Sequence, residues 1–125
     1  MYANAAPKEV YPKAKEAAQK ALEIDDSLAE AHASLGFVQT DFDWDWTGAE
    51  TEIQKAIALN PNYAVAHYYN AILLKYTKRI DQALLEDQRA MELDPLSPSI
   101  GRNLGTSLYF SRQYDKAADQ YRKTL

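Results

Sequence analysis

His32 and His67 are the only histidines in this sequence, and histidine is the side chain best suited to exchange a proton near neutral pH. The usual carriers of nucleophilic catalysis are a cysteine, or a serine placed with a histidine and an acid. The chain has no cysteine, and it shows no serine–histidine–acid constellation. We therefore expect a protein that is not an enzyme and that uses no cofactor.

Three acids at alternate positions, Asp41, Asp43 and Asp45, form the strongest metal signal in the chain. With Glu52 eleven residues after Asp41, the run has the ligand spacing of a calcium loop. Such a loop needs glycine at its sixth position, but Trp46 stands there, and Glu52 belongs to a predicted helix. Calcium binding at this run is therefore only a remote alternative.

The segment 41–48 is better explained as a connector between two helices. We expect either Trp44 or Trp46 to fill the gap between the helices that it joins. Either Asp45 or Thr47 would then cap the helix that follows, because both side chains can accept a hydrogen bond from a free backbone N–H group.

The composition of the chain is that of one globular domain, with 125 residues, 46% of them hydrophobic and 26% charged. The net charge of −4 argues against a nucleic-acid partner. The charge is uneven, since residues 23–60 hold nine acids and one base, and residues 99–125 hold five bases and two acids. This unevenness favours solvated helix faces, or else a basic end that meets the acidic part of another copy.

No cysteine is present, so the chain has no disulfide framework and no cysteine metal site. No apolar run approaches the ~20 residues that span a membrane. The first ten residues also lack the basic-then-apolar order of a signal peptide. We expect a cytoplasmic protein without a membrane partner.

About seven helices and no strand are expected, because apolar residues recur at three- and four-residue steps and no segment alternates. The first helix begins near Pro12, or one turn earlier at Lys8, and proline suits a first helical turn. The later helices are predicted at residues 28–40, 49–59, 63–76, 81–93, 99–110 and 115–125.

A helix–turn–helix sequence similar to that of residues 56–67 occurs three times, which indicates an internal repeat. Ala49, Ala83 and Ala117 lie 34 residues apart. A second series gives steps of 35 and 34 residues, from Gly36 to Ala71 to Gly105, so we place one added residue in the connector 41–48. Small residues at these positions allow neighbouring helices to lie close together.

These positions resemble the tetratricopeptide repeat (TPR), in which a large residue and Leu-Gly are followed by an alanine, an aromatic residue and a closing proline. The first full repeat matches at His32, Leu35, Gly36, Gln39, Ala49, Ile53, Ala56 and Pro61. A looser second copy matches at His67, Asn70, Ala71, Leu74, Ala83, Asp87, Ala90 and Pro95. The third matches at Gly101, Leu104, Gly105, Leu108, Ala117 and Tyr121.

The resemblance implies a right-handed superhelix of antiparallel helix pairs, in one array over residues 1–125. Residues 8–26 would be the second helix of a partial repeat, followed by repeats at 28–61, 63–95 and 98–125. Residues 42–46 followed by 52–56, and residues 94–98 and 108–115, further resemble the TPR regions of bacterial multidomain regulators. In those proteins the repeats follow a winged-helix, protein kinase or nucleotide cyclase domain. We therefore expect a fragment of a longer protein.

The function that the TPR resemblance implies is a protein–protein interaction scaffold, which binds a peptide or a partner helix in its concave groove. By this alignment the groove holds Glu30, Phe37, Asp41, Val65, Tyr68, Ile72, Lys75, Tyr76, Arg102, Thr106, Tyr109 and Phe110. Lys75 and Arg102 would steer acidic groups, and the aromatic residues would supply contact area. Packing against a neighbouring repeat is the alternative use of this face.

The alignment also assigns packing roles. The two histidines occupy the position of a large packing residue, and Tyr114 and Tyr121 are expected in the core. Some family members clamp a chaperone's C-terminal carboxylate, but the matching positions here are Ala33, Phe37, Tyr69, Ser99 and Asn103, so that ligand is not expected.

Self-assembly into a homo-oligomer is the main alternative function. The last helix has no further helix to cover Ala118, Tyr121 and Leu125, which would leave apolar surface exposed. That surface could meet the alanine face of the first helix in another copy, or its own counterpart.

Overall fold

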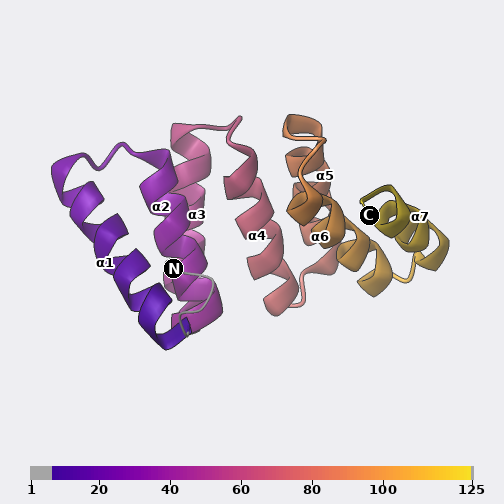
Figure 1. Ribbon diagram of the computed structural model, residues 1–125, viewed down its shortest axis with the longest axis horizontal. Coiled ribbons are helices and arrows are strands. Elements are labelled where there is room, and N and C mark those ends of the chain that lie inside the picture. The colour runs from indigo at the N-terminus through magenta and orange to yellow at the C-terminus, as the bar shows by residue number, and fades with distance from the viewer. Residues whose placement is uncertain (1–6, 125) are drawn as a thin grey trace. The chain divides into compact units, whose positions relative to one another are not determined.

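The computed structural model describes residues 7–124 and contains seven α-helices, one short π-helix and no strand within that range (Figure 1). The elements are α1 (Pro7–Ile24), α2 (Ala29–Val38), the π-helix η2 (Gln39–Asp43), α3 (Trp46–Leu59), α4 (Ala64–Tyr76), α5 (Ile80–Leu93), α6 (Pro98–Phe110) and α7 (Tyr114–Thr124). The predicted all-α repeat fold is confirmed. The chain divides into two compact units, Met1–Pro61 and Asn62–Leu125.

In the first unit, α2 packs between α1 and α3. Of the two predicted starts for the first helix, the earlier is right, because α1 begins at Pro7 and Pro12 lies inside it. Two contacts hold α1 to the end of the next helix: the Tyr11 hydroxyl donates to Asp41 at 2.9 Å, and the Lys15 ammonium pairs with Asp43 at 2.6 Å.

The first helix of each repeat ends at a residue in the left-handed backbone conformation. These residues are Trp44, Lys78 and Arg112, with φ of 58°, 61° and 65°, and they lie 34 positions apart. In the second and third repeats, the N–H that follows donates to the carbonyl five residues earlier, as in a Schellman motif. The backbone conformation therefore repeats with the same period of 34 residues as the side-chain pattern.

The first repeat differs because its turn is one residue wider. The N–H of Asp45 donates to the carbonyl of Gln39, six residues earlier, at 2.8 Å. The added residue therefore widens the last turn of the helix, which becomes the π-helix η2. The predicted connector 41–48 is too long at both ends, since helical structure continues through Asp43 and α3 begins at Trp46.

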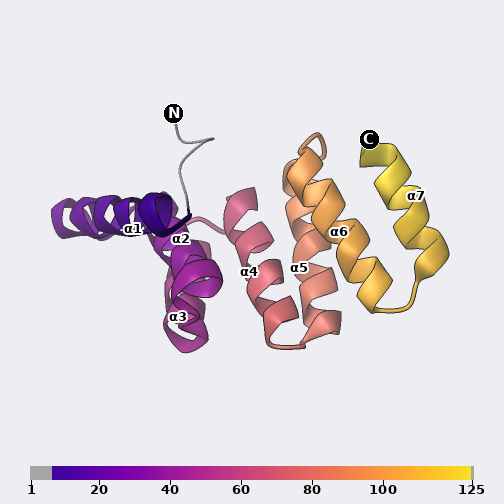
Figure 2. The same cartoon turned by 60° about the horizontal axis from the view of Figure 1, so that its bottom comes forward.

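In the second unit, α5 packs against α4 and α6, and α6 packs against α7 (Figure 2). Ser97 caps α6 by accepting from the N–H of Ile100 at 3.3 Å. Leu104, Leu108 and Ala117 form an apolar cluster, against which Tyr121 packs. The core position expected for Tyr114 is wrong, because that side chain is 54% exposed.

Close approach explains the two mid-helix glycines. A Cβ atom on Gly36 would lie 2.6 Å from Cγ1 of Ile53, and one on Gly105 would lie 2.5 Å from Cε1 of Tyr121. Both distances are too short for real contacts, so a side chain at either position would require Ile53 or Tyr121 to move. No helix within residues 7–124 is both long and apolar enough to cross a membrane.

Candidate functional site

The α4–α6 hollow is a surface depression of about 360 Å³ in the second unit. Its lining residues are Ile72, Lys75, Tyr76, Asn103, Thr106 and Phe110. Five of these six were predicted for the groove, and Asn103 was not. They converge because Ile72 and Tyr76, like Thr106 and Phe110, are four residues apart and share a helix face.

Exposed aromatic rings edge this hollow. Tyr76 and Phe110 are 44% and 55% exposed, although both are large and largely apolar. Tyr109, also predicted for the groove, packs edge-on against Phe110 with ring centroids 5.8 Å apart, and against Tyr114 at 5.4 Å. Tyr109 is thus in contact with both Phe110 and Tyr114, while all three rings stay more than half exposed.

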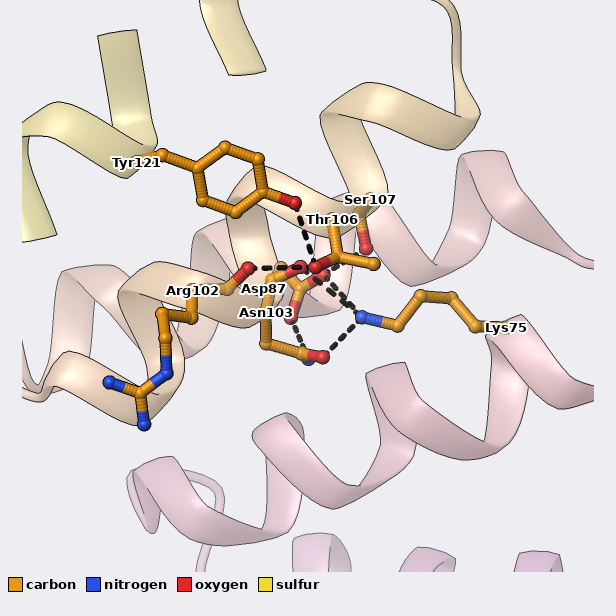
Figure 3. A network of polar contacts seen from close by, with 7 residues as sticks. All are labelled: Lys75, Asp87, Arg102, Asn103, Thr106, Ser107 and Tyr121. Atoms are coloured by element: carbon orange, nitrogen blue, oxygen red, sulfur yellow. Dashed lines mark hydrogen bonds and ion pairs between the residues drawn. The ribbon is translucent and has the colours of Figure 1, made fainter. Parts of the chain in front are cut away.

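A buried polar network centred on Asp87 of α5 adjoins the hollow (Figure 3). The Asp87 carboxylate is completely buried. It accepts from the side-chain amide of Asn103 at 2.5 Å and from the Ser107 hydroxyl, and the Lys75 ammonium lies 3.7 Å away. Lys75 also donates to the backbone carbonyl of Asn103 at 3.2 Å and to its side-chain oxygen. The network joins α4, α5 and α6.

Burial sets the energetics of this ion pair. It raises the pKa of Asp87, with Lys75, Ser107 and Asn103 acting in the opposite direction. Burial likewise lowers the pKa of Lys75, opposed by Asp87. For both groups the loss of hydration on burial outweighs the opposing effect of the partner charge.

The predicted steering role of Lys75 is therefore wrong. Its side chain is only 11% exposed, and its ammonium donates to groups of the protein itself. The signal that could have revealed this is Asp87, an acid at the position where the first repeat has the buried Ile53. An acid at a core position predicts a buried cationic partner.

Arg102 has the opposite character. Its side chain is exposed and extends away from Lys75 and Asp87 (Figure 3). It makes one long hydrogen bond, to the Ser99 hydroxyl at 3.4 Å, and no carboxylate in the part of the chain that the structure describes pairs with it. Burial raises the pKa of the half-buried Tyr68, and the charge of Arg102 lowers it. Arg102 lies on α6 about one turn before Thr106, which lines the hollow.

The remaining predicted groove residues do not line the hollow. Val65 is half-buried near the start of α4. In the first unit Glu30 is exposed, but Phe37 packs edge-on against the ring of Tyr11, and Asp41 accepts from the Tyr11 hydroxyl. Helix α1 therefore engages Phe37 and Asp41.

The acids of the run 41–45 serve separate structural purposes. Asp41 and Asp43 hold α1, and Asp45 caps α3 by accepting from the N–H of Gly48 at 3.0 Å. Within residues 7–124 no three potential ligands come together as a metal site. Trp46 is the tryptophan that packs, with its N–H donating to the Thr40 carbonyl at 3.3 Å, whereas Trp44 is 69% exposed.

Both histidines are buried beside an acid of the neighbouring helix. Nδ1 of His32 lies 2.6 Å from Oε2 of Glu52, and Nδ1 of His67 lies 2.6 Å from Oε2 of Glu86. Nε2 of His32 lies 2.7 Å from the Asp26 carbonyl. These contacts fit the packing role expected for the histidines.

The self-association surface predicted on α7 is altered by the position of Tyr121. Its ring lies against Gly105, and its hydroxyl is 3.0 Å from that of Thr106, so it faces α6 (Figure 3). Placing Tyr121 on an uncovered face was therefore wrong. Ala118 is half-buried, and Leu125 lies outside the described residues.

Comparisons with known proteins support the fold. No family model matches the chain, and no curated protein matches it by sequence. Among solved structures, PilF of Pseudomonas aeruginosa is 29% identical with a TM-score of 0.82, over 94% of this chain and 54% of PilF. YrrB, described as a TPR protein with an unusual peptide-binding site, is 26% identical with a TM-score of 0.73, over 94% of this chain and 60% of YrrB. A structure of MamA is 25% identical with a TM-score of 0.75, over 93% of this chain and 63% of MamA.

These similarities, with the helix pairs and the 34-residue period, define an all-α helical repeat protein with the TPR fold. The chain spans less than two thirds of the length of each of these three proteins.

Proposed function

We propose that this chain is a non-enzymatic protein–protein interaction scaffold, and that a peptide or helix of another protein binds in the α4–α6 hollow. The observation that carries the proposal is the hollow itself, about 360 Å³ in volume and edged by the exposed rings of Tyr76 and Phe110. Exposed aromatic rings beside a depression are a common feature of peptide-binding surfaces.

The structure around the hollow favours binding. Tyrosine and phenylalanine present a large contact area with few rotatable bonds, so little conformational entropy is lost when a partner binds. The network beneath the hollow ties α4 and α6 to the same buried carboxylate, Asp87, which keeps the two walls in register. The description of YrrB as having a peptide-binding site supports this assignment by similarity.

We also propose that this chain is one part of a longer protein. The likeness of residues 42–46 and 94–98 to the TPR regions of bacterial multidomain regulators supports a place for this chain in a longer protein. In such a protein the chain would supply the binding surface for a partner, and another domain would supply the regulated activity.

Affinity selection from a phage-displayed library of random dodecapeptides would test this function. The full 125-residue chain is the target, and the selected peptides are then measured by calorimetry. We expect Phe110→Ser to weaken their binding at least tenfold, because it removes an exposed ring from the edge of the hollow.

Leu85→Ser is the matched control. Leu85 is 67% exposed on α5 and does not line the hollow, so its loss should leave binding unchanged. A library that yields no binder, or binders indifferent to Phe110→Ser, would contradict the proposed function.

A further inference from the structure

We infer that the α4–α6 hollow selects a peptide in which a large uncharged apolar side chain enters the hollow and an acid two to four residues away pairs with Arg102. This inference rests on the proposed function and adds the chemistry of the ligand. Three observations carry it: the internal neutralisation of Lys75, the free charge of Arg102, and the distance along α6 between Arg102 and the hollow.

The hollow suits an uncharged anchor. Its one charged lining residue, Lys75, is paired with Asp87 at 3.7 Å and donates twice to Asn103, so its charge is already balanced within the protein. A cationic ligand group would meet the charge of Lys75, and no acid lines the hollow to receive it. A charged ligand group would thus lose hydration without gaining a counter-charge. Apolar surface from Ile72, Tyr76 and Phe110 favours a large apolar side chain.

Arg102 supplies the charge recognition that Lys75 cannot. Its guanidinium is exposed and has no carboxylate partner within residues 7–124. A guanidinium presents a planar fork of donors that matches a carboxylate with two parallel hydrogen bonds. The second unit has nine bases and seven acids, a net charge of +2, so the surroundings also favour an acidic partner.

The helix geometry fixes the spacing of the two contacts. Arg102 precedes Thr106 by four residues and Phe110 by eight, which places it about 6 Å and about 12 Å from them along α6. An extended peptide advances about 3.3 Å per residue, so two to four residues separate the apolar anchor from the acid.

Repeating the library selection on Arg102→Glu tests this inference. We expect peptides selected on the wild type to pair a large apolar residue with Asp or Glu two to four positions away. On Arg102→Glu the acid should give way to Lys or Arg. A wild-type peptide should bind this variant at least tenfold more weakly, and replacing its acid by lysine should restore the affinity. Lys116→Glu, which changes an exposed lysine of α7 outside the hollow, should alter neither selection.

The outcomes separate the two proposals. Binders that depend on Phe110 but carry no acid, or that keep the same acid on Arg102→Glu, would overturn this inference and leave the proposed function standing. An acid enriched at the anchor itself would also overturn it, because Lys75 would then be the recognising group. A dimer that Phe110→Ser dissociates in sedimentation would place a second copy in the hollow and overturn it as well. Failure to obtain any binder that depends on Phe110 would overturn both proposals.

Discussion

The first full repeat, α2 with α3, and the second, α4 with α5, share a plan but differ at two linked core positions. In both, a buried histidine contacts a glutamate of the facing helix at 2.6 Å. At the next pair of equivalent positions, the first repeat has Thr40 and Ile53, both fully buried, and the second has Lys75 and Asp87. The second repeat thus has a buried ion pair where the first has a buried hydroxyl and a buried apolar side chain.

This difference shows how one scaffold provides two kinds of surface. In the first unit, Tyr11 of α1 engages Phe37 and Asp41 of the face predicted to bind a partner. In the second unit, Asp87 ties α6 to the pair before it, and the aromatic residues beside it stay exposed. The charges differ too: the first unit has five bases and eleven acids, against nine bases and seven acids in the second.

The largest effect should come from breaking the ion pair on one side only. Asp87→Leu leaves the 11%-exposed Lys75 without its counter-charge, and we expect the free energy of unfolding in urea to fall by about 3–5 kcal/mol. The double variant Lys75→Met with Asp87→Leu removes both charges and should be clearly more stable than Asp87→Leu. A double variant as unstable as the single one would show that Asp87 acts mainly through Asn103 and Ser107.

The shared histidine contacts should respond alike. Glu52→Leu and Glu86→Leu each remove the partner of a buried ring nitrogen, and we expect each to lower the free energy of unfolding by about 1–3 kcal/mol. Circular dichroism during urea titration measures both. A large cost at one site and none at the other would break the equivalence of the two repeats at these positions.

Gly36 and Gly105 allow the helix packing of the first repeat to be compared with that of the third. Gly36→Ala gains helix propensity but drives a methyl group into the fully buried Ile53, so a net loss of about 1 kcal/mol is expected. Gly105→Ala meets the ring of Tyr121, which is half-exposed and can shift, so its cost should be smaller. Thermal unfolding of both variants is the measurement, and a reversed order would contradict this packing.

The smallest effect concerns the Tyr68 phenol. Because burial raises its pKa, the stability that the neutral phenol contributes is complete below the ordinary tyrosine value of about 10 and is lost as pH rises through the raised value. Arg102→Gln removes a charge that lowers this pKa, so the pKa should rise further. NMR of the Tyr68 ring carbon during a pH titration measures the change. An unchanged pKa would show that Arg102 lies too far from Tyr68 to affect its ionisation.

Helix positions could be predicted from the sequence because prolines mark the helix ends and alanines recur every 34 residues where helices pack closely. The π-helix could not, because whether an added residue lengthens a connector or widens a helix end depends on the contacts of Tyr11 and Lys15 with that segment. The lining of the hollow was largely predictable from the TPR alignment, which placed five of its six residues in the groove. The role of Lys75 was missed because spacing on α4 alone does not reveal it. The signal lies on α5, where the acid Asp87 occupies the core position that Ile53 has in the first repeat.

NMR of the labelled full chain can show whether a partner binds in the α4–α6 hollow. A selected peptide is titrated into the chain while amide and methyl shifts are followed. We expect the largest shifts at Ile72, Thr106 and Phe110, with Arg102 responding only when the peptide carries its acid. Largest shifts in α1 to α3, with the signals of the hollow unmoved, would contradict this expectation.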